Sequence, residues 1–419
     1  MSNNTLTVPQ MVAAEAQRIA HEKAIFVGTI NREYDDSYAK TGAKIGDTLK
    51  VRQPNQYTVS TSSRVMDVQD QDESTISVVM ASQYHVDMRF NSAELALSID
   101  QLSKRYIEPA VSVLVSKIDG ECLQTATQET FNVAGTAGTV PGTVTSGFSD
   151  TSALGKARAK VNQGLAPLDD RVGMFDSVTM ASITNGIKVM NNPSGDVSKA
   201  WREGFVGRAA GLDLYENERG WSMTNGDDVA GLIDESSATN FVQGATTLHI
   251  DTLGTGSITK GQVFEIDGIY ACHPETKAAY PHKQQFVVTS TVAIGSNECD
   301  VTFTPAIYTT GAKKNVCTST GADVTWTYSA QNDVVVTFFG SASTTYKQNL
   351  VYHKDAFTFV TADLPLMGGA DKCARITKDG ISLRVWQDGD IRNDELLMRI
   401  DILWGFKTMR PYWASRVTN

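Results

Sequence analysis

The clearest pattern in the chain is an alternation of apolar and polar residues between positions 76 and 90. The apolar face consists of Ile76, Val78, Met80, Tyr84, Val86, Met88 and Phe90, and only Ser82 interrupts it. This period of two predicts a long β-strand, because successive side chains of a strand point to opposite faces. A shorter alternation at 48–52 predicts a partner strand. We therefore predict an extended β-hairpin arm over residues 48–90, suited to packing on another subunit.

The second strong pattern is a helical stripe within residues 91–131. Asn91 and Glu94 have the spacing of a capping box. Proline is tolerated in the first helical turn but not in the interior, so Pro109 predicts that the main helix begins near Glu108. The apolar stripe comprises Val111, Leu114, Val115, Ile118 and Cys122 and ends near Thr130. The length allows a spine helix, although the spacing alone favours an ordinary core helix.

Shorter elements flank these two patterns. Pro9 opens an amphipathic helix at 8–23, within an N-terminal arm that we assign to residues 1–47. After the spine, helix and strand patterns alternate, and the predicted segments are a helix at 151–164, a strand at 169–175 and a helix at 177–190. Such alternation is typical of a mixed α/β domain. We assign this central domain to residues 132–223 and 346–380.

Residues 224–345 show short alternations between turn residues, with no helical period. The predicted strands lie at 246–250, 262–266, 285–289, 300–303 and 333–338. Regularly spaced short strands are typical of a small barrel or sandwich. Because the mixed α/β pattern resumes at Tyr352, we predict an inserted all-β barrel domain. The chain ends in two strands, at 381–386 and 395–406, which we assign with the rest of 381–419 to the peripheral domain of the spine helix.

The composition of the chain argues against several classes of function. The chain has 419 residues, enough for more than one core. Its formal net charge of −10 and pI of about 5.2 argue against a strongly nucleic-acid-binding surface. We expect a soluble, cytoplasmic protein, because the first residues lack a secretory signal and no apolar run is long enough for a membrane span. The 5 cysteines include no C-x-x-C pair, so free thiols are expected.

No arrangement of residues predicts catalysis or ligand binding. Gly256–Gly261 begins like a phosphate loop, but Gln262 stands where a lysine is required. The possible soft metal ligands have the spacing of no compact zinc pattern; they are Cys272, His273, His282 and Cys299. The acidic stretch 67–73 lacks the glycine and the final carboxylate of a calcium loop. We therefore assign no catalytic, cofactor-binding or metal-ligating residue and no cofactor, and we expect the protein not to be an enzyme.

The order of these parts resembles a known protein family. The segments of the main body that carry the resemblance are Ile45–Pro54 (IGDTLKVRQP), Ile118-Asp119 and Arg399–Gly405 (RIDILWG). They are similar to segments of the major capsid proteins of tailed bacteriophages with the Hong Kong 97-type fold. Three further segments resemble the short-tailed-phage coat proteins that carry an inserted β-barrel. They are Lys260–Tyr270 (KGQVFEIDGIY), Gln285–Thr289 (QFVVT) and His353–Phe357 (HKDAF). The resemblance covers nearly the whole chain.

The resemblance implies an α+β, Hong Kong 97-like phage capsid fold with an N-arm, an extended β-hairpin arm, a long spine helix, a central α/β domain and the inserted barrel. It implies a major capsid protein that self-assembles, as pentamers and hexamers, into the icosahedral shell around the double-stranded DNA genome of a tailed bacteriophage. Assembly would take place in the host cytoplasm. Scaffolding and portal proteins are implied partners, the packaged DNA would be held without sequence-specific binding, and no membrane is involved.

Two other classes of protein share features with this sequence. An encapsulin-like nanocompartment shell has the same fold, but those shells generally lack such a barrel, so residues 224–345 favour a virus. A β-rich surface adhesin is suggested only by the Thr/Gly-rich strands and would need an export signal.

The hairpin also bears on covalent chemistry. Some shells of this fold join a hairpin lysine to an asparagine of a neighbouring subunit through an isopeptide bond. Here Lys50 lies at the base of the arm, and no lysine occurs between Val51 and Phe90. We therefore expect noncovalent contacts to hold the shell together.

Overall fold

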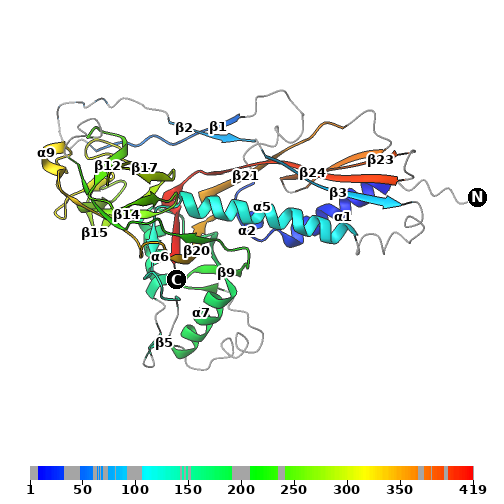
Figure 1. Cartoon of the computed structure of the whole chain (residues 1–419), viewed down its shortest axis with the longest axis horizontal. Helices are drawn as coiled ribbons and strands as arrows, with labels where there is room; N and C mark the ends of the chain where they lie inside the picture. Colours follow the sequence, from blue (N-terminus) through cyan, green and yellow to red (C-terminus); the bar gives the residue numbers. More distant parts are fainter. Residues whose placement is uncertain are drawn as a thin grey trace, which may run out of the picture. The chain divides into compact units, whose positions relative to one another are not determined.

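A computed structural model of the chain describes residues 8–32, 48–59, 74–80, 82–91, 106–141, 152–190, 208–234, 241–366, 372–378, 380–390 and 395–418, together with 64, 66, 68, 144–145 and 148–149. The described chain is mixed α/β and mostly strand (Figure 1). It divides into two compact units. Unit 1 contains Met1–Arg52, Thr75–Cys122 and Phe357–Met409, and unit 2 contains Gln53–Ser74, Leu123–Ala356 and Arg410–Asn419.

Unit 1 is built on an antiparallel sheet. Its strand order is β21 (Phe357–Ala362), β24 (Glu395–Thr408), β23 (Ile381–Asp390) and β22 (Lys372–Lys378), with β3 (Ser82–Asn91) also paired to β24. Strand β24 is long because its apolar residues recur at every second position and are buried at Met398, Ile400, Ile402 and Trp404. A separate ladder joins β1 (Thr48–Arg52) to β2 (Thr75–Val79).

Two helices that start in unit 1 begin where the sequence predicts, and a third, short helix was not predicted. Helix α1 (Val8–Lys23) carries Pro9 in its first turn. Helix α2 (Phe26–Thr29) follows, and Phe26 packs against Phe357 with ring centroids 5.9 Å apart. Helix α5 (Glu108–Glu129) starts in this unit. Its buried Asp119 accepts a hydrogen bond of 2.9 Å from the backbone N–H of Val27, which gives a structural reason for an acid at this core position.

The structure corrects the prediction for residues 76–91. The predicted single strand is two strands, because β2 pairs with β1 whereas β3 pairs with β24. The alternation continues across the break, with Val78 and Met80 buried, so the sequence pattern does not reveal the change of partner. Asn91 ends strand β3 and is therefore not a helix cap. Helix α5 begins at Glu108 as predicted, and residues 92–105 lie outside the described part of the chain.

The close approach of β2 to β24 explains why the Arg399–Gly405 segment ends in a glycine. A Cβ atom added there would lie 2.5 Å from the carbonyl oxygen of Val79. Strand β24 and the end of β2 therefore approach as closely as they do because residue 405 has no side chain.

Unit 2 contains a second sheet, flanked by α6 (Ser152–Gln163) and α7 (Ser177–Met190). Its strand order is β4 (Val133–Ala134), β25 (Ala414–Thr418), β20 (Thr345–His353), β7 (Arg171–Phe175), β9 (Leu212–Glu216) and β8 (Arg208–Ala209), and β10 (Ser222–Thr224) also pairs with β20. The buried core between helices and sheet includes Leu154, Ala157, Val161, Phe175, Ile183 and Val351. The predicted helices at 151–164 and 177–190 and the strand at 169–175 are confirmed.

Strand β25 corrects the assignment of residues 381–419. Residues 414–418 pair with β20 and β4 in the sheet of unit 2, whereas β23 and β24 belong to unit 1. The prediction missed this strand because every residue of β25 is buried, so no apolar/polar alternation marks it.

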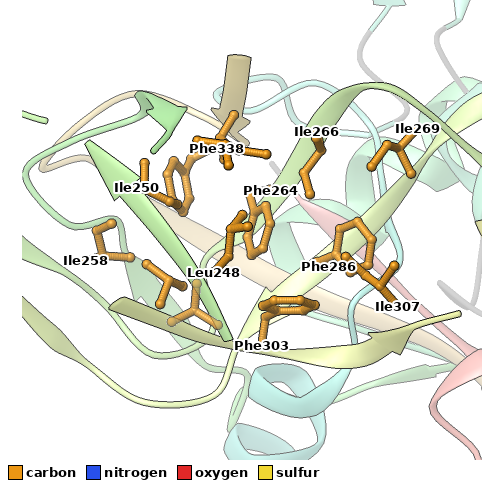
Figure 2. Close-up of a cluster of buried hydrophobic side chains, with 14 of the residues drawn as sticks. Leu248, Ile250, Ile258, Phe264, Ile266, Ile269, Phe286, Phe303, Ile307 and Phe338 are labelled. Carbon is orange, nitrogen blue, oxygen red and sulfur yellow. The ribbon is translucent and has the colours of Figure 1, made fainter. Parts of the chain in front are cut away.

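Unit 2 also contains a closed six-stranded barrel. Its strands are β11 (Ala230–Ile233), β12 (Ala245–Asp251), β14 (Val263–Cys272), β15 (Ala279–Val288), β17 (Cys299–Ile307) and β19 (Val335–Phe338). The order is β15-β17-β12-β11-β19-β14, and pairing of β14 with β15 closes the ring. Inward-pointing residues fill it, as Figure 2 shows. The ring of Phe264 lies 5.4 Å from Phe286, 5.7 Å from Phe303 and 5.5 Å from Phe338. Each of the five predicted strands is confirmed.

Short elements complete unit 2. They are β5 (Val144–Thr145), β6 (Phe148–Ser149), β13 (Gly256–Ile258), β16 (Val292–Ile294), β18 (Val316–Cys317), α9 (Tyr328–Gln331), η3 (Lys354–Ala356) and η4 (Pro411–Trp413). Most of them connect strands of the barrel or of the sheet.

Candidate assembly surfaces

The segment between β1 and β2 exposes large apolar side chains. Val59 is 92% exposed, Met66 84% and Val68 76%. Residues 53–59 form no helix or strand. Several such side chains in one segment are typical of a surface that another chain covers. The acidic stretch 67–73 lies, apart from Val68, outside the described residues.

Lys50 lies within the paired base of the same arm. Its Cα pairs with that of Ser77 in the β1–β2 ladder, and its side chain is exposed. This agrees with its predicted place at the base of the arm rather than along its length.

Arg416 joins three parts of unit 2. Its side chain extends from β25, is 1% exposed, and donates hydrogen bonds of 2.7 Å to the carbonyl oxygen of Thr130 and 2.8 Å to that of Gly261. Burial lowers the pKa of Arg416 to about 9. The contacts tie the turn before β14 of the barrel to the sheet and to the chain following α5. A guanidinium suits this place because it presents several donors in a fixed plane.

A second polar link joins α6 to the barrel at Gln285. Lys160 Nζ and the backbone N–H of Val133 both donate to Gln285 Oε1, the latter at 2.8 Å. Gln285 Nε2 donates to Glu265 Oε1 at 2.9 Å. Burial lowers the pKa of Lys160 to about 8, although the negative charge of Glu265 opposes this shift. The barrel is therefore fixed to α6 and β4 by buried polar contacts.

A cavity of about 550 Å³ lies beside this link. Its walls are formed by residues of β4, α6, β14, β15 and the end of β19. His282 lines it and stacks on Tyr280, with centroids 5.6 Å apart. Burial, and then the positive charge of Lys160, lower the pKa of His282 to about 4. The imidazole is therefore neutral near pH 7.

The cysteines belong to cores rather than to a reactive centre. Cys122, Cys272, Cys299 and Cys317 are buried, and burial raises the pKa of each thiol. The raised pKa disfavours the thiolate, which is the reactive and metal-binding form. Cys373 is partly exposed, and all five are free, as the sequence predicts.

The phosphate-loop-like segment Gly256–Gly261 forms a strand and a tight turn. β13 occupies Gly256–Ile258, and Gly261 has a φ of +93°. The buried Gln262 closes the turn, because its side-chain oxygen accepts a hydrogen bond of 2.8 Å from the N–H of Thr259. Strand β14 follows instead of the helix that a phosphate loop needs.

Among the described residues, one set of possible metal ligands lies together that spacing along the sequence could not indicate. Ligand atoms of Asp234, His249 and Glu298 lie within 4.8 Å of one another. The set includes none of the residues Cys272, His273, His282 and Cys299. It arises from strand pairing in the barrel, so only the strand order could have predicted it. Among the described helices, none is long and apolar enough to cross a membrane.

The sequence matches the family model described as P22 coat protein, gene protein 5, over residues 29–415. A search of curated proteins finds no match.

Several solved phage structures are similar in fold. One, of Mycobacterium phage Che8, has 12% identity and a TM-score of 0.48, covering 94% of this chain and 90% of that one. The capsid structure of Cyanophage P-SCSP1u has 12% identity and a TM-score of 0.44, covering 89% of this chain and 83% of that one. A structure of Gordonia phage Cozz has 10% identity and a TM-score of 0.39, covering 89% and 80%. At these scores the family match, not the structural likeness, carries the assignment.

Proposed function

Because the chain belongs to the P22 coat protein family and is a major capsid protein of a tailed phage, we propose that it builds an icosahedral shell of pentamers and hexamers around double-stranded DNA. The single observation that carries this proposal is the family match over residues 29–415. The exposed apolar residues of the β1–β2 segment support it, since a coat subunit acts through contacts with its neighbours.

We assign the parts of the chain to a Hong Kong 97-type subunit. Residues 1–47 are the N-terminal arm, 48–80 the hairpin arm and 92–131 the spine. Strand β3 is moved from the arm to the peripheral domain because it pairs with β24. The central domain is 132–223 with 346–356, and β25 is added to it because this strand pairs with β20. Residues 357–380, predicted to be central, are moved to the peripheral domain because β21 and β22 pair within the sheet of unit 1. Residues 224–345 are the inserted barrel, and 381–409 complete the peripheral domain, because residues 410–419 belong to unit 2. The hairpin arm lies over a neighbouring subunit and the barrel clamps adjacent subunits, so that burial over several interfaces makes shell closure cooperative.

The partners follow from this role. The acidic chain, with a net charge of −10, encloses DNA without binding a particular sequence or adhering strongly to it. Scaffolding and portal proteins guide assembly in the host cytoplasm, and the mature protein resides in the virion capsid. No enzymatic activity is assigned. The encapsulin-like and adhesin interpretations are not retained, because no observation favours either over membership of a phage coat protein family.

Electron microscopy of the purified chain tests the proposal. We expect shells, tubes or capsomers, alone or with a scaffolding protein. A chain that stays strictly monomeric by light scattering at high concentration, with and without the scaffold, would contradict it.

The covalent state of the shell is tested separately. Because Lys50 is at the paired base of the arm, we expect mature particles boiled in detergent to run as a 45.4 kDa monomer. A ladder of covalent oligomers that persists under reducing conditions would show that an isopeptide or similar bond forms after all.

A further inference from the structure

Three segments of the barrel converge around His249. His249 lies in β12, Asp234 directly follows β11, and Glu298 directly precedes β17. The pairing of Ile233 with Ile250 holds Asp234 beside β12. The antiparallel bridge between Gly295 and Glu298 holds the turn that carries the glutamate. The site is therefore built on paired strands, which position side chains more precisely than free loops do.

Asp300 fixes the orientation of the imidazole. It lies directly opposite His249 in the ladder of β12 and β17, and its Oδ1 is 2.7 Å from His249 Nδ1. With the proton on Nδ1 donated to this carboxylate, Nε2 carries the lone pair. Nε2 is inaccessible to solvent and has no hydrogen-bond partner among the described residues. A carboxylate on Nδ1 and a free Nε2 is the arrangement seen for histidines that bind metal ions.

The distances from Nε2 to the two carboxylates are longer than those of charged hydrogen bonds. Nε2 is 3.4 Å from Asp234 Oδ2 and 3.7 Å from Glu298 Oε2. A charged N–H donating to a carboxylate would lie closer, at about 2.7–2.9 Å. Ligand atoms bound to one tetrahedral ion with bonds of about 2.0–2.1 Å are separated by roughly 3.3–3.4 Å. The observed distances are close to that value, so a small shift of two side chains would complete the site.

The charges and access at the site also suit a cation. Three carboxylates, of Asp234, Glu298 and Asp300, surround one imidazole. The local field is therefore negative. Glu298 is more than half exposed, which gives an ion a path from solvent.

We propose that Asp234, His249 and Glu298 bind a divalent transition-metal cation such as Zn²⁺, with Asp300 as the residue that positions His249. The nitrogen ligand favours Zn²⁺ over Mg²⁺ and Ca²⁺, which prefer oxygen ligands only. Three protein ligands leave a further position for water. The ion would join the end of β11, the strand β12 and the turn before β17, and so stabilise this end of the barrel.

The test uses the full-length protein, stripped with a chelator and titrated with Zn²⁺ by calorimetry and with Co²⁺ by visible absorption. We expect one ion per chain and a rise in the melting temperature of the barrel on addition of Zn²⁺. The Co²⁺ spectrum should lack thiolate charge-transfer bands, because no cysteine is a ligand. Ca²⁺ should bind at least tenfold more weakly than Zn²⁺.

Matched variants locate the site. Glu298→Gln should weaken Zn²⁺ binding at least tenfold, whereas Glu275→Gln, the same change at another exposed barrel position, should leave it unaltered. Asp300→Asn should weaken it by roughly 10–100-fold, as loss of a carboxylate behind a ligand histidine does. Absence of saturable binding, Zn²⁺ binding by Glu298→Gln equal to that by Glu275→Gln, or a Co²⁺–thiolate band would each overturn the proposal. Equal affinity for Ca²⁺ would overturn the transition-metal assignment.

Discussion

Apolar side chains are buried in the barrel but exposed in the segment between β1 and β2. In the barrel, closure by β14 and β15 removes the sheet edges and places Phe264 and its neighbours inside. In the segment, Val59, Met66 and Val68 are almost fully exposed. The barrel residues therefore stabilise the chain that contains them, whereas the segment residues are exposed in this chain and would gain burial by contact with another. Substitutions in the two regions should affect different measurements.

The largest change in stability is expected for Phe264→Ala. Phe264 is fully buried and contacts three other phenylalanine rings, so the substitution removes apolar burial and leaves a cavity. We expect a loss of about 3–5 kcal/mol in the free energy of unfolding of the barrel. Hydrogen exchange of barrel peptides in the full-length protein measures it. Val335→Ala, at an exposed position of β19, is the control and should change stability by less than about 0.5 kcal/mol. Similar losses for both variants would contradict a closed core.

Arg416→Met should have the next largest effect. It leaves the carbonyl groups of Thr130 and Gly261 without their donor, and one such buried group costs about 1–3 kcal/mol. Removal of a buried charge offsets part of this cost. We expect a net loss of about 1–3 kcal/mol by denaturant unfolding, with faster hydrogen exchange at 259–262. Arg208→Met, at an exposed ion pair with Asp213, is the control, and the idea fails if the two variants are equally stable.

Local patterns predicted the elements well, and long-range pairing explains what they missed. Helix α5 begins at Glu108 because the proline at position 109 favours the first turn of a helix, and strand β17 of the barrel alternates because it has one buried face. By contrast, β3 pairs with β24 across about three hundred positions of sequence, which no local period encodes. Strand β25 was missed for a related reason, since Arg416 occupies the middle of a fully buried strand.

The candidate metal site shows the same limit. The three ligands match no known sequence motif for metal binding, because 15 positions separate Asp234 from His249 and 49 separate His249 from Glu298. They meet because β12 pairs with both β11 and β17. Spacing rules detect ligands that share one turn or one helix, so they directed attention to Cys272 and His273 instead.

A smaller change in the free energy of unfolding is expected when the pH changes the protonation of His282. Its pKa is about 4 in the folded chain, below the ordinary value of 6.5, because of burial and Lys160. The unfolded chain therefore binds more protons between these values, so this contribution to stability is complete above pH 6.5 and is lost as the pH falls toward 4. Lys156 and Glu265, which carry opposite charges, line the same cavity.

The measurement compares the free energy of unfolding of the wild type and His282→Asn across this pH window. We expect the wild type to lose on the order of 1 kcal/mol more than the variant. Lys160→Met should reduce the difference without abolishing it, because burial is the larger cause of the shift. Identical slopes for wild type and His282→Asn would contradict the assignment of a neutral, buried imidazole.

The smallest change in stability, and the largest in assembly, is expected for the double variant Val59→Asp with Val68→Asp. Both side chains are exposed in the isolated chain, so the free energy of unfolding should change by less than about 0.5 kcal/mol. In a shell the same positions would bury unpaired carboxylates against a neighbour, which is strongly unfavourable. Sedimentation and electron microscopy should therefore show folded subunits that do not form shells. The variant Val59→Leu with Val68→Leu keeps the apolar character and should assemble. Normal shells from the aspartate variant would show that this segment faces solvent in the capsid and that the subunits bind one another elsewhere.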